Sequence, residues 1–385
     1  MSSQRTNTPG KADGRNIDPA GGTLEGEGSL QRVRSFVHED RHADGLRAPV
    51  TSVALDRSAP TYYGQPMLKP TVWKWSVPTY FYIGGVAGAT SALRAATLLW
   101  GGGRFPTFAR AARWVGMVGD VVSGVLLIED LGRPERFLNM MRVFRPTSPM
   151  NLGTWILSGS GALNTAGLLF ADRTGWLGRM GRGAEVGAGV LGLGLTGYTG
   201  VLLANTAVPV WQGACLSLPP LFVSASAASA GSLFQLLPVA DEERTLLRRF
   251  SIAGQVGVLA SSWMLEREVG RSPEAARPLR EGVSGALWKA SKLLTAASLI
   301  LSLLPGDRKG KRVAAAVLGT AGSLAMRFGI FQAGRSSARS PRDSFGQQRA
   351  GLGANAVMGL SAVTGPGERA VVGQPVVAYR LPVIR

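Results

Sequence analysis

The sequence predicts an all-α integral membrane protein, a bundle of about eight transmembrane helices between two polar tails. Three observations carry this prediction. Of the 385 residues, 45% are apolar and only 17% are charged, whereas about a quarter of the residues of an ordinary globular domain are charged. Apolar runs long enough to span a bilayer recur along the chain. Glycine occurs 52 times, and small residues between leucine and valine let membrane helices approach closely.

Two polar tails flank the apolar region. Residues 1–70 are rich in Gly, Arg, Ser, Asp and Pro and contain no apolar signal segment, so we expect a disordered extension. Residues 335–385 have a similar composition and predict a flexible tail. Residues 71–334 form the predicted membrane domain, and Trp73 and Trp75 precede its first apolar run as headgroup-level aromatic anchors.

The predicted transmembrane segments follow one another with short connectors. A helix needs about 20 residues to cross about 30 Å of hydrocarbon. The segment at 250–265 is short, and the segment at 285–304 carries Lys289 and Lys292 near its start, so seven crossings are the fallback. The eight segments lie at approximately 77–100, 113–129, 152–171, 186–204, 217–239, 250–265, 285–304 and 313–333.

Charge and cysteine content exclude several classes of protein. The net charge of +18 comes from Lys and Arg that lie mainly between apolar runs or in the tails, which is typical of loops flanking membrane spans and not of a nucleic-acid surface. One cysteine, Cys215, excludes an intrachain disulfide and an iron–sulfur cluster held by this chain alone. Because His38 and His42 lie in the amino-terminal tail, no predicted span offers a histidine to haem, and we predict no metal site.

The connector at 130–150 combines arginines with two proline breaks. Its short amphipathic piece predicts a segment lying at the membrane interface with the arginines outward. Lipid phosphate is one partner for such arginines; a docked extrinsic protein is the other, because the guanidinium fork pairs well with carboxylates. The uncharged connector at 205–217 is predicted on the same membrane face, and the orientation stays open. The arginines proposed for docking are Arg133, Arg136, Arg142 and Arg145.

Several motifs identify a family. The stretches "DLGRPERF", "RVFRPTSPMNLGTWIL" and "GYTGVLLANTAVPVW", followed by "PLFVSASAASAG", resemble the polysulphide reductase membrane-subunit family, the NrfD/PsrC-like proteins. The resemblance covers roughly residues 60–333 and follows the family's motif order. The stretch "YYGQPMLKPTVWKW" resembles the start of actinobacterial members.

The resemblance implies a multi-pass protein of the bacterial cytoplasmic membrane that anchors an oxidoreductase complex without being catalytic alone. It implies that the chain binds menaquinone or another quinone. It also implies an iron–sulfur, ferredoxin-like partner and, through it, a molybdopterin catalytic subunit. Since this chain has no haem or cluster ligands of its own, electrons would pass between the quinone and the neighbouring protein. A secondary transporter and a non-redox membrane scaffold are the alternatives.

Ionisable residues inside predicted spans are the first candidates for the chemistry, because burying them in lipid is costly. Arg94 and Asp120 are predicted about 10 Å deep from one membrane face, from a rise of about 1.5 Å per residue. They would form either a structural ion pair or a proton relay in which Asp120 is catalytic. Asp130 is the second catalytic candidate, as a proton acceptor near the partner, unless it pairs with Arg133.

Tyr198 is the predicted quinone-binding residue. Glycines surround it in its own segment and would leave room for a flat ring, and by resemblance it matches a quinone-site position. Asn205, seven residues later, lies on the same helix face and would bind the other quinone oxygen or cap the helix. Three further polar residues within spans are expected mainly to join helices: Asn164, Gln235 and Arg327.

Overall fold

The computed structural model describes residues 17–18, 23–24, 68, 71–131, 135–306, 308–340 and 343–344, with only the backbone of residues 17–18, 23–24, 136 and 138. The chain divides into two units, and the helical one comprises Trp73–Ser337 and Arg342–Arg385. In the other unit, strands β1 (Ile17–Asp18) and β2 (Thr23–Leu24) pair antiparallel. The sequence did not predict this strand pair, and most of both predicted tails lies outside the described residues.

The helical unit confirms the all-α prediction. Three short helices lie between the long ones: α3 (Glu135–Met140), α6 (Pro209–Gln212) and α9 (Pro273–Arg280). Each long helix coincides with one of the eight predicted segments. The long helices are α1 (Ser76–Trp100), α2 (Pro106–Asp130), α4 (Pro149–Phe170), α5 (Gly175–Ala204), α7 (Leu218–Leu236), α8 (Asp241–Val269), α10 (Gly282–Leu303) and α11 (Lys309–Arg339).

Several helices extend well beyond the apolar segments that predicted them. Helix α5 begins at Gly175 instead of residue 186, and α8 begins at Asp241 instead of residue 250. An apolar window marks only the part suited to hydrocarbon. Glu, Arg and Lys are good helix formers, so the charged turns outside that window stay helical.

Four helices of the described chain, α2, α5, α10 and α11, are long and apolar enough to cross a membrane by length and composition. The weakly predicted segment at 285–304 lies in α10, which qualifies, whereas the segment at 250–265 lies in α8, which does not. Helix α8 opens with the sequence "DEERTLLRR". The hydropathy of α7 is lowered by serines that face other helices and not lipid, as the buried Ser226, Ser229 and Ser232 show.

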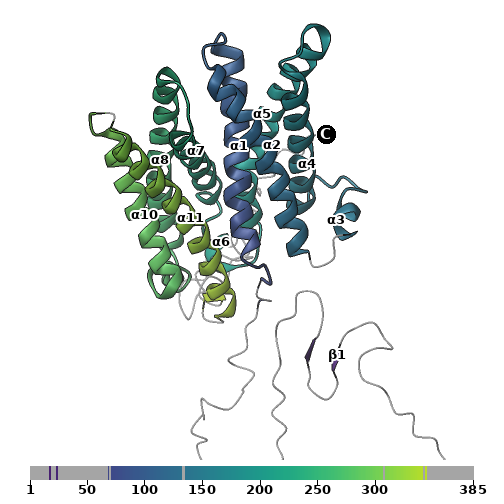
Figure 1. The fold of residues 1–385 in the computed structure, drawn as a ribbon. Helices are drawn as coiled ribbons and strands as arrows, with labels where there is room; N and C mark the ends of the chain where they lie inside the picture. The colour runs from purple at the N-terminus through teal and green to yellow at the C-terminus, as the bar shows by residue number, and fades with distance from the viewer. Residues whose placement is uncertain are drawn as a thin grey trace, which may run out of the picture. The chain divides into compact units, whose positions relative to one another are not determined.

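The long helices form two groups of four. In the first bundle, α1 packs against α2 and α5, and α4 packs against the same two helices. In the second bundle, α8 packs against α7 and α10, and α11 joins through hydrogen bonds from Ser298 to the Ala315 carbonyl and between Ser229 and Ser323. Figure 1 shows the first bundle in blue to teal and the second in green to yellow. Contacts of α7 with α1 and α5 join the bundles.

Small residues set the spacing inside the first bundle. A Cβ atom on Gly88 of α1 would lie 2.6 Å from the Gly192 carbonyl oxygen of α5, and one on Gly192 would lie 2.5 Å from the Gly88 oxygen. The two backbones therefore touch, and only glycine fits at either position. This contact is the close approach expected from the glycine content of the chain.

Carboxylates from other helices satisfy the free N–H groups at two helix starts. Glu243 of α8 accepts hydrogen bonds from the backbone N–H groups of Thr107 (2.9 Å) and Phe108 (3.1 Å) at the start of α2. Glu268 accepts from the backbone N–H groups of Leu216 and Ser217, both at 3.0 Å, at the start of α7. Because α2 and α8 belong to different bundles, Glu243 also ties the bundles together.

Candidate functional site

A pair of tyrosines lies inside the first bundle. The hydroxyl of Tyr198 on α5 lies 2.8 Å from the hydroxyl of Tyr80 on α1, and Tyr80 is only 2% exposed. The space for Tyr198 comes from α4, where a Cβ on Gly153 would lie 2.2 Å from the Tyr198 ring. The sequence attributed this space to glycines of the same helix. Those glycines meet other helices instead, as Gly200 does at the Leu218 carbonyl.

A second polar group surrounds Asp120 of α2, which is 3% exposed. Its Oδ2 accepts hydrogen bonds from Ser160 Oγ (2.7 Å) and Asn164 Nδ2 (2.8 Å) on α4, and Asn164 Oδ1 accepts one from Ser91 Oγ on α1 (3.0 Å). Asp120 Oδ1 has no hydrogen-bond partner among the described residues. A buried carboxyl group with one oxygen unpaired is suited to accepting a proton.

The predicted ion pair between Arg94 and Asp120 is not formed. Arg94 Nη2 donates to Glu185 Oε2 on α5 at 2.8 Å, and Arg113 Nε donates to Glu185 Oε1 at 2.5 Å. The two predicted partners face different neighbours: Arg94 is directed to α5, and Asp120 to α4. The predicted common depth is wrong as well. Gly119 of α2 meets Ala87 of α1, so Asp120 lies about two turns away from the level of Arg94, because α2 begins at Pro106 instead of residue 113.

Glu185 is the residue that sequence reasoning missed. The apolar segment predicted from residue 186 placed it just outside a span, although a lone carboxylate in "GRGAEVGAG" was a usable signal. It is buried between two arginines. Arg113 continues the cluster to Asp172 at 2.6 Å, in the turn between α4 and α5, and this hydrogen bond lowers the pKa of the Asp172 carboxyl.

The two remaining predicted residues lie at helix ends. Asp130 Oδ1 accepts from the backbone N–H of Lys74 (3.0 Å) and from Ser76 Oγ (3.4 Å), so it holds the start of α1 to the end of α2. Its alternative partner, Arg133, lies outside the described residues. Asn205 is exposed and donates to the Val201 carbonyl of its own helix at 2.9 Å. This contact is that of a helix cap, and the structure does not bring Asn205 to the tyrosine pair.

The arginine connector folds back onto the start of α4. Asn151 Nδ2 donates to the carbonyls of Met140 (2.6 Å) and Val143 (2.9 Å), and its Oδ1 accepts from the Arg145 N–H (2.7 Å). The side chains of Arg142 and Arg145 are exposed and form no ion pair within the described part of the chain. Arg136 lies in α3, where only its backbone is described, and Arg133 lies outside the described residues.

The connector and the tyrosine pair meet on the same two turns of α4. Gly153, which touches Tyr198, follows two residues after Asn151, which holds the connector. Thr154 and Ser158 lie against the sulfur atoms of Met140 and Met141, at 3.9 and 3.6 Å. The start of α4 therefore contacts the connector with some residues and Tyr198 with others.

Arg327 acts as an interhelical connector, as expected of a lone polar group in a span. It is fully buried, with Nε donating to the Phe81 carbonyl (3.0 Å) and Nη2 to Ser226 Oγ (3.1 Å), while Nη1 bonds Ser323. It forms no ion pair with a described carboxylate. These contacts join α1, α7 and α11.

Comparison with known proteins gives one family. The family described as polysulfide reductase, of the NrfD type, matches residues 59–339. The match does not distinguish an actinobacterial type, so that part of the prediction is not supported. A search of curated proteins finds no match to this chain. Within the described residues, no group of three or more His, Cys, Asp or Glu side chains is placed to hold a metal ion.

Proposed function

Since this chain belongs to the polysulfide reductase membrane-subunit family of the NrfD type, we propose that it binds a quinone and exchanges electrons with an iron–sulfur partner subunit. The chain is a multi-pass membrane protein, and its family typically supplies membrane anchors of oxidoreductase complexes. The finer assignment, to a molybdoenzyme-type complex that uses menaquinone or another quinone, is part of the proposal.

One observation carries the proposal: the paired hydroxyl groups of Tyr80 and Tyr198 lie inside the bundle, next to an exposed cationic segment. Tyr198 packs on Gly153, and Asn151, one half-turn earlier in α4, holds the segment that presents Arg142 and Arg145. Redox exchange between a lipid-soluble carrier and an extrinsic protein needs these two features close together. A membrane scaffold without redox chemistry would not need two phenol groups inside the bundle next to the arginine connector.

The residues present fit a quinone. A bound quinol supplies two electrons and two protons on oxidation, and these residues provide the hydrogen bonds and proton acceptor. In the tyrosine pair one hydroxyl donates to the other, so the proton of the accepting hydroxyl is left to bond a carbonyl oxygen of the ligand. Asp120, with its unpaired oxygen, is the proposed proton acceptor. Asp130 is proposed as a second acceptor at the connector end, and Asn205 is less suited because its amide already caps α5.

The exposed arginines are the proposed docking contacts. Arg142 and Arg145 carry charges that no described carboxylate neutralises, and their planar guanidinium groups pair well with carboxylates of a protein partner. The three hydrogen bonds of Asn151 hold the backbone at Met140, Val143 and Arg145. The backbone that carries the two arginines is therefore held in place before a partner binds.

The test is capture of the tagged chain in mild detergent, followed by iron and quinone analysis. In the double variant Arg142→Glu, Arg145→Glu we expect the amount of iron that co-purifies with the chain to fall by a factor of about ten or more. The reason is that like-charge contacts at an interface cost several kcal/mol. The matched control reverses Arg104 and Arg173, two exposed arginines at the other end of the same bundle. Equal amounts of iron in the two double variants would show that Arg142 and Arg145 do not dock the partner. A wild-type chain that purifies without iron or quinone would favour the secondary transporter.

A further inference from the structure

A polar cavity of about 190 Å³ lies in the second bundle, at the end opposite the connector. Its walls come from the end of α7, the first turns of α8, the end of α10 and the start of α11. The volume is well above the roughly 10–15 Å³ that a single water needs. It is too small for most drug-sized ligands, whose pockets measure about 300–1,000 Å³.

Positive charge dominates the lining. Arg244 is paired with Asp241, the one carboxylate among the described lining residues. Arg248 forms no ion pair or hydrogen bond within the described part of the chain. Lys311 Nζ donates to the carbonyls of Leu304 (2.6 Å) and Pro305 (3.3 Å), which leave its charge uncompensated. Arg312 lines the same space.

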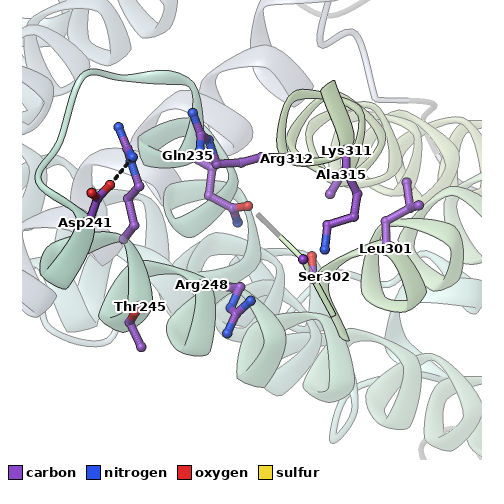
Figure 2. A pocket seen from close by; sticks show the side chains of 11 residues that line it. Gln235, Asp241, Thr245, Arg248, Leu301, Ser302, Lys311, Arg312 and Ala315 are labelled. Carbon is purple, nitrogen blue, oxygen red and sulfur yellow. Dashed lines mark hydrogen bonds and ion pairs between the residues drawn. The ribbon is translucent and has the colours of Figure 1, made fainter. Parts of the chain in front are cut away.

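Two buried donors face this charge without partners. Gln235 and Ser302 are each only 6% exposed, and neither Gln235 Nε2 nor Ser302 Oγ has a hydrogen-bond partner among the described residues. Figure 2 shows the Gln235 amide, the Ser302 hydroxyl and the Lys311 ammonium directed into one space. Buried polar atoms are normally hydrogen-bonded, so a polar occupant of the cavity is expected.

We propose that this cavity binds the phosphate group of an anion, either an anionic phospholipid headgroup or a free phosphate compound. Donors converge from four helices: Gln235 on α7, Arg248 on α8, Ser302 on α10 and Lys311 on α11. A carboxylate offers two oxygens in one plane, whereas a phosphate offers several oxygens in different directions, which suits this arrangement. Basic pockets between membrane helices near the headgroup level are suited to anionic lipids.

The proposal does not rest on quinone chemistry, because the cavity lies in the other bundle and at the end opposite the connector, whereas Tyr198 packs on Gly153 beside the connector. Gln235 was expected mainly to join helices. The unpaired amide of Gln235 indicates a ligand in the cavity, which arginines at the surface alone would not.

The experiment measures thermal unfolding of the purified full-length chain in detergent. The probes are inorganic phosphate against sodium chloride at equal ionic strength, and phosphatidylglycerol against phosphatidylcholine in the micelles. We expect Arg248→Gln to weaken binding of the effective probe about tenfold, or about 1.4 kcal/mol. Arg249→Gln, an exposed neighbour that does not line the cavity, is the matched control and should bind as the wild type does.

A second variant, Gln235→Leu, distinguishes loss of binding from loss of folding. Gln235→Leu removes an unpaired buried amide, so the melting temperature without probe should not fall, while the stabilisation by the probe should be lost. Stabilisation by phosphatidylglycerol alone identifies a lipid headgroup; stabilisation by inorganic phosphate identifies a free phosphate compound. Equal responses to phosphate and chloride together with equal responses to the two lipids, or equal binding by Arg248→Gln and Arg249→Gln, would overturn the proposal.

Discussion

Glu185 and Asp120 are two buried carboxylates of the first bundle, and their hydrogen-bond partners differ in charge. Glu185 accepts from Arg94 and Arg113, so removing it would leave two guanidinium groups unpaired, and breaking a buried pair costs about 3–5 kcal/mol. Asp120 has only neutral donors, Ser160 and Asn164. Its charge is therefore less firmly fixed, which suits a group that gains and loses a proton, while Glu185 is suited to holding helices together.

The phenol of Tyr198 gives a residue-scale prediction. In Tyr198→Phe we expect quinol-linked turnover to fall roughly 2- to 12-fold, the equivalent of one hydrogen bond of about 0.5–1.5 kcal/mol. Turnover is measured in the assembled complex together with the iron content, which should not change. Tyr82→Phe removes a phenol that lies beside Arg327 instead and is the control. Turnover that falls equally in both variants would take Tyr198 out of the site.

The connector shows how an element depends on one side chain. Helix α3 has only six residues, too few to be stable alone. Asn151 makes one hydrogen bond to its last residue, Met140, and two to the stretch that follows, at Val143 and Arg145. After Met140 the chain turns and is no longer helical.

Asn151→Ala is the element-scale prediction. The connector should detach from α4 while the bundles stay folded, because each lost hydrogen bond contributes about 1 kcal/mol and none of the three lies between long helices. Limited trypsin digestion would show faster cleavage after Arg142, which precedes Val143; the bond after Arg145 is resistant because Pro146 follows it. Asn205→Ala, which loses only a bond within its own helix, serves as the reference, and identical cleavage of the two variants would contradict the role of Asn151.

At the scale of the whole helical unit, two four-helix bundles share an interface. A cluster of buried side chains from both bundles includes Phe108 of α2 with Phe234 of α7, whose rings pack edge to face. Glu243, 1% exposed, lies beside this contact and binds the first N–H groups of α2. The joint therefore combines apolar packing with a buried carboxylate that a helix start neutralises.

Glu243→Ala should loosen this joint. We expect a loss of at least about 2 kcal/mol in the free energy of unfolding, because hydrogen bonds to a charged group contribute about 1.5–3 kcal/mol each. Thermal unfolding in detergent measures the effect. Glu242→Ala changes the exposed neighbour and should stay within about 0.5 kcal/mol of the wild type. A Glu243→Ala protein as stable as the Glu242→Ala protein would show that packing alone joins the bundles.

The sequence by itself determined the helical class, the order of the long helices, the family and the arginine connector. These properties follow from apolar run length, small-residue content and motif order, which are read along the chain. It also selected Tyr198 and Asp120 as polar residues inside the bundle, because polar groups inside apolar runs are few. Their catalytic roles stay predictions.

Only the tertiary structure decided which polar groups meet. Arg94 and Asp120 bind residues of different helices, the room at Tyr198 comes from Gly153 on another helix, and Glu185 and Tyr80 became visible as partners only once α1 and α5 were in contact. The physical reason is that the helical period fixes the spacing of residues along one helix, whereas the packing of backbones at contacts such as Gly88 with Gly192 fixes how each helix is rotated against its neighbours.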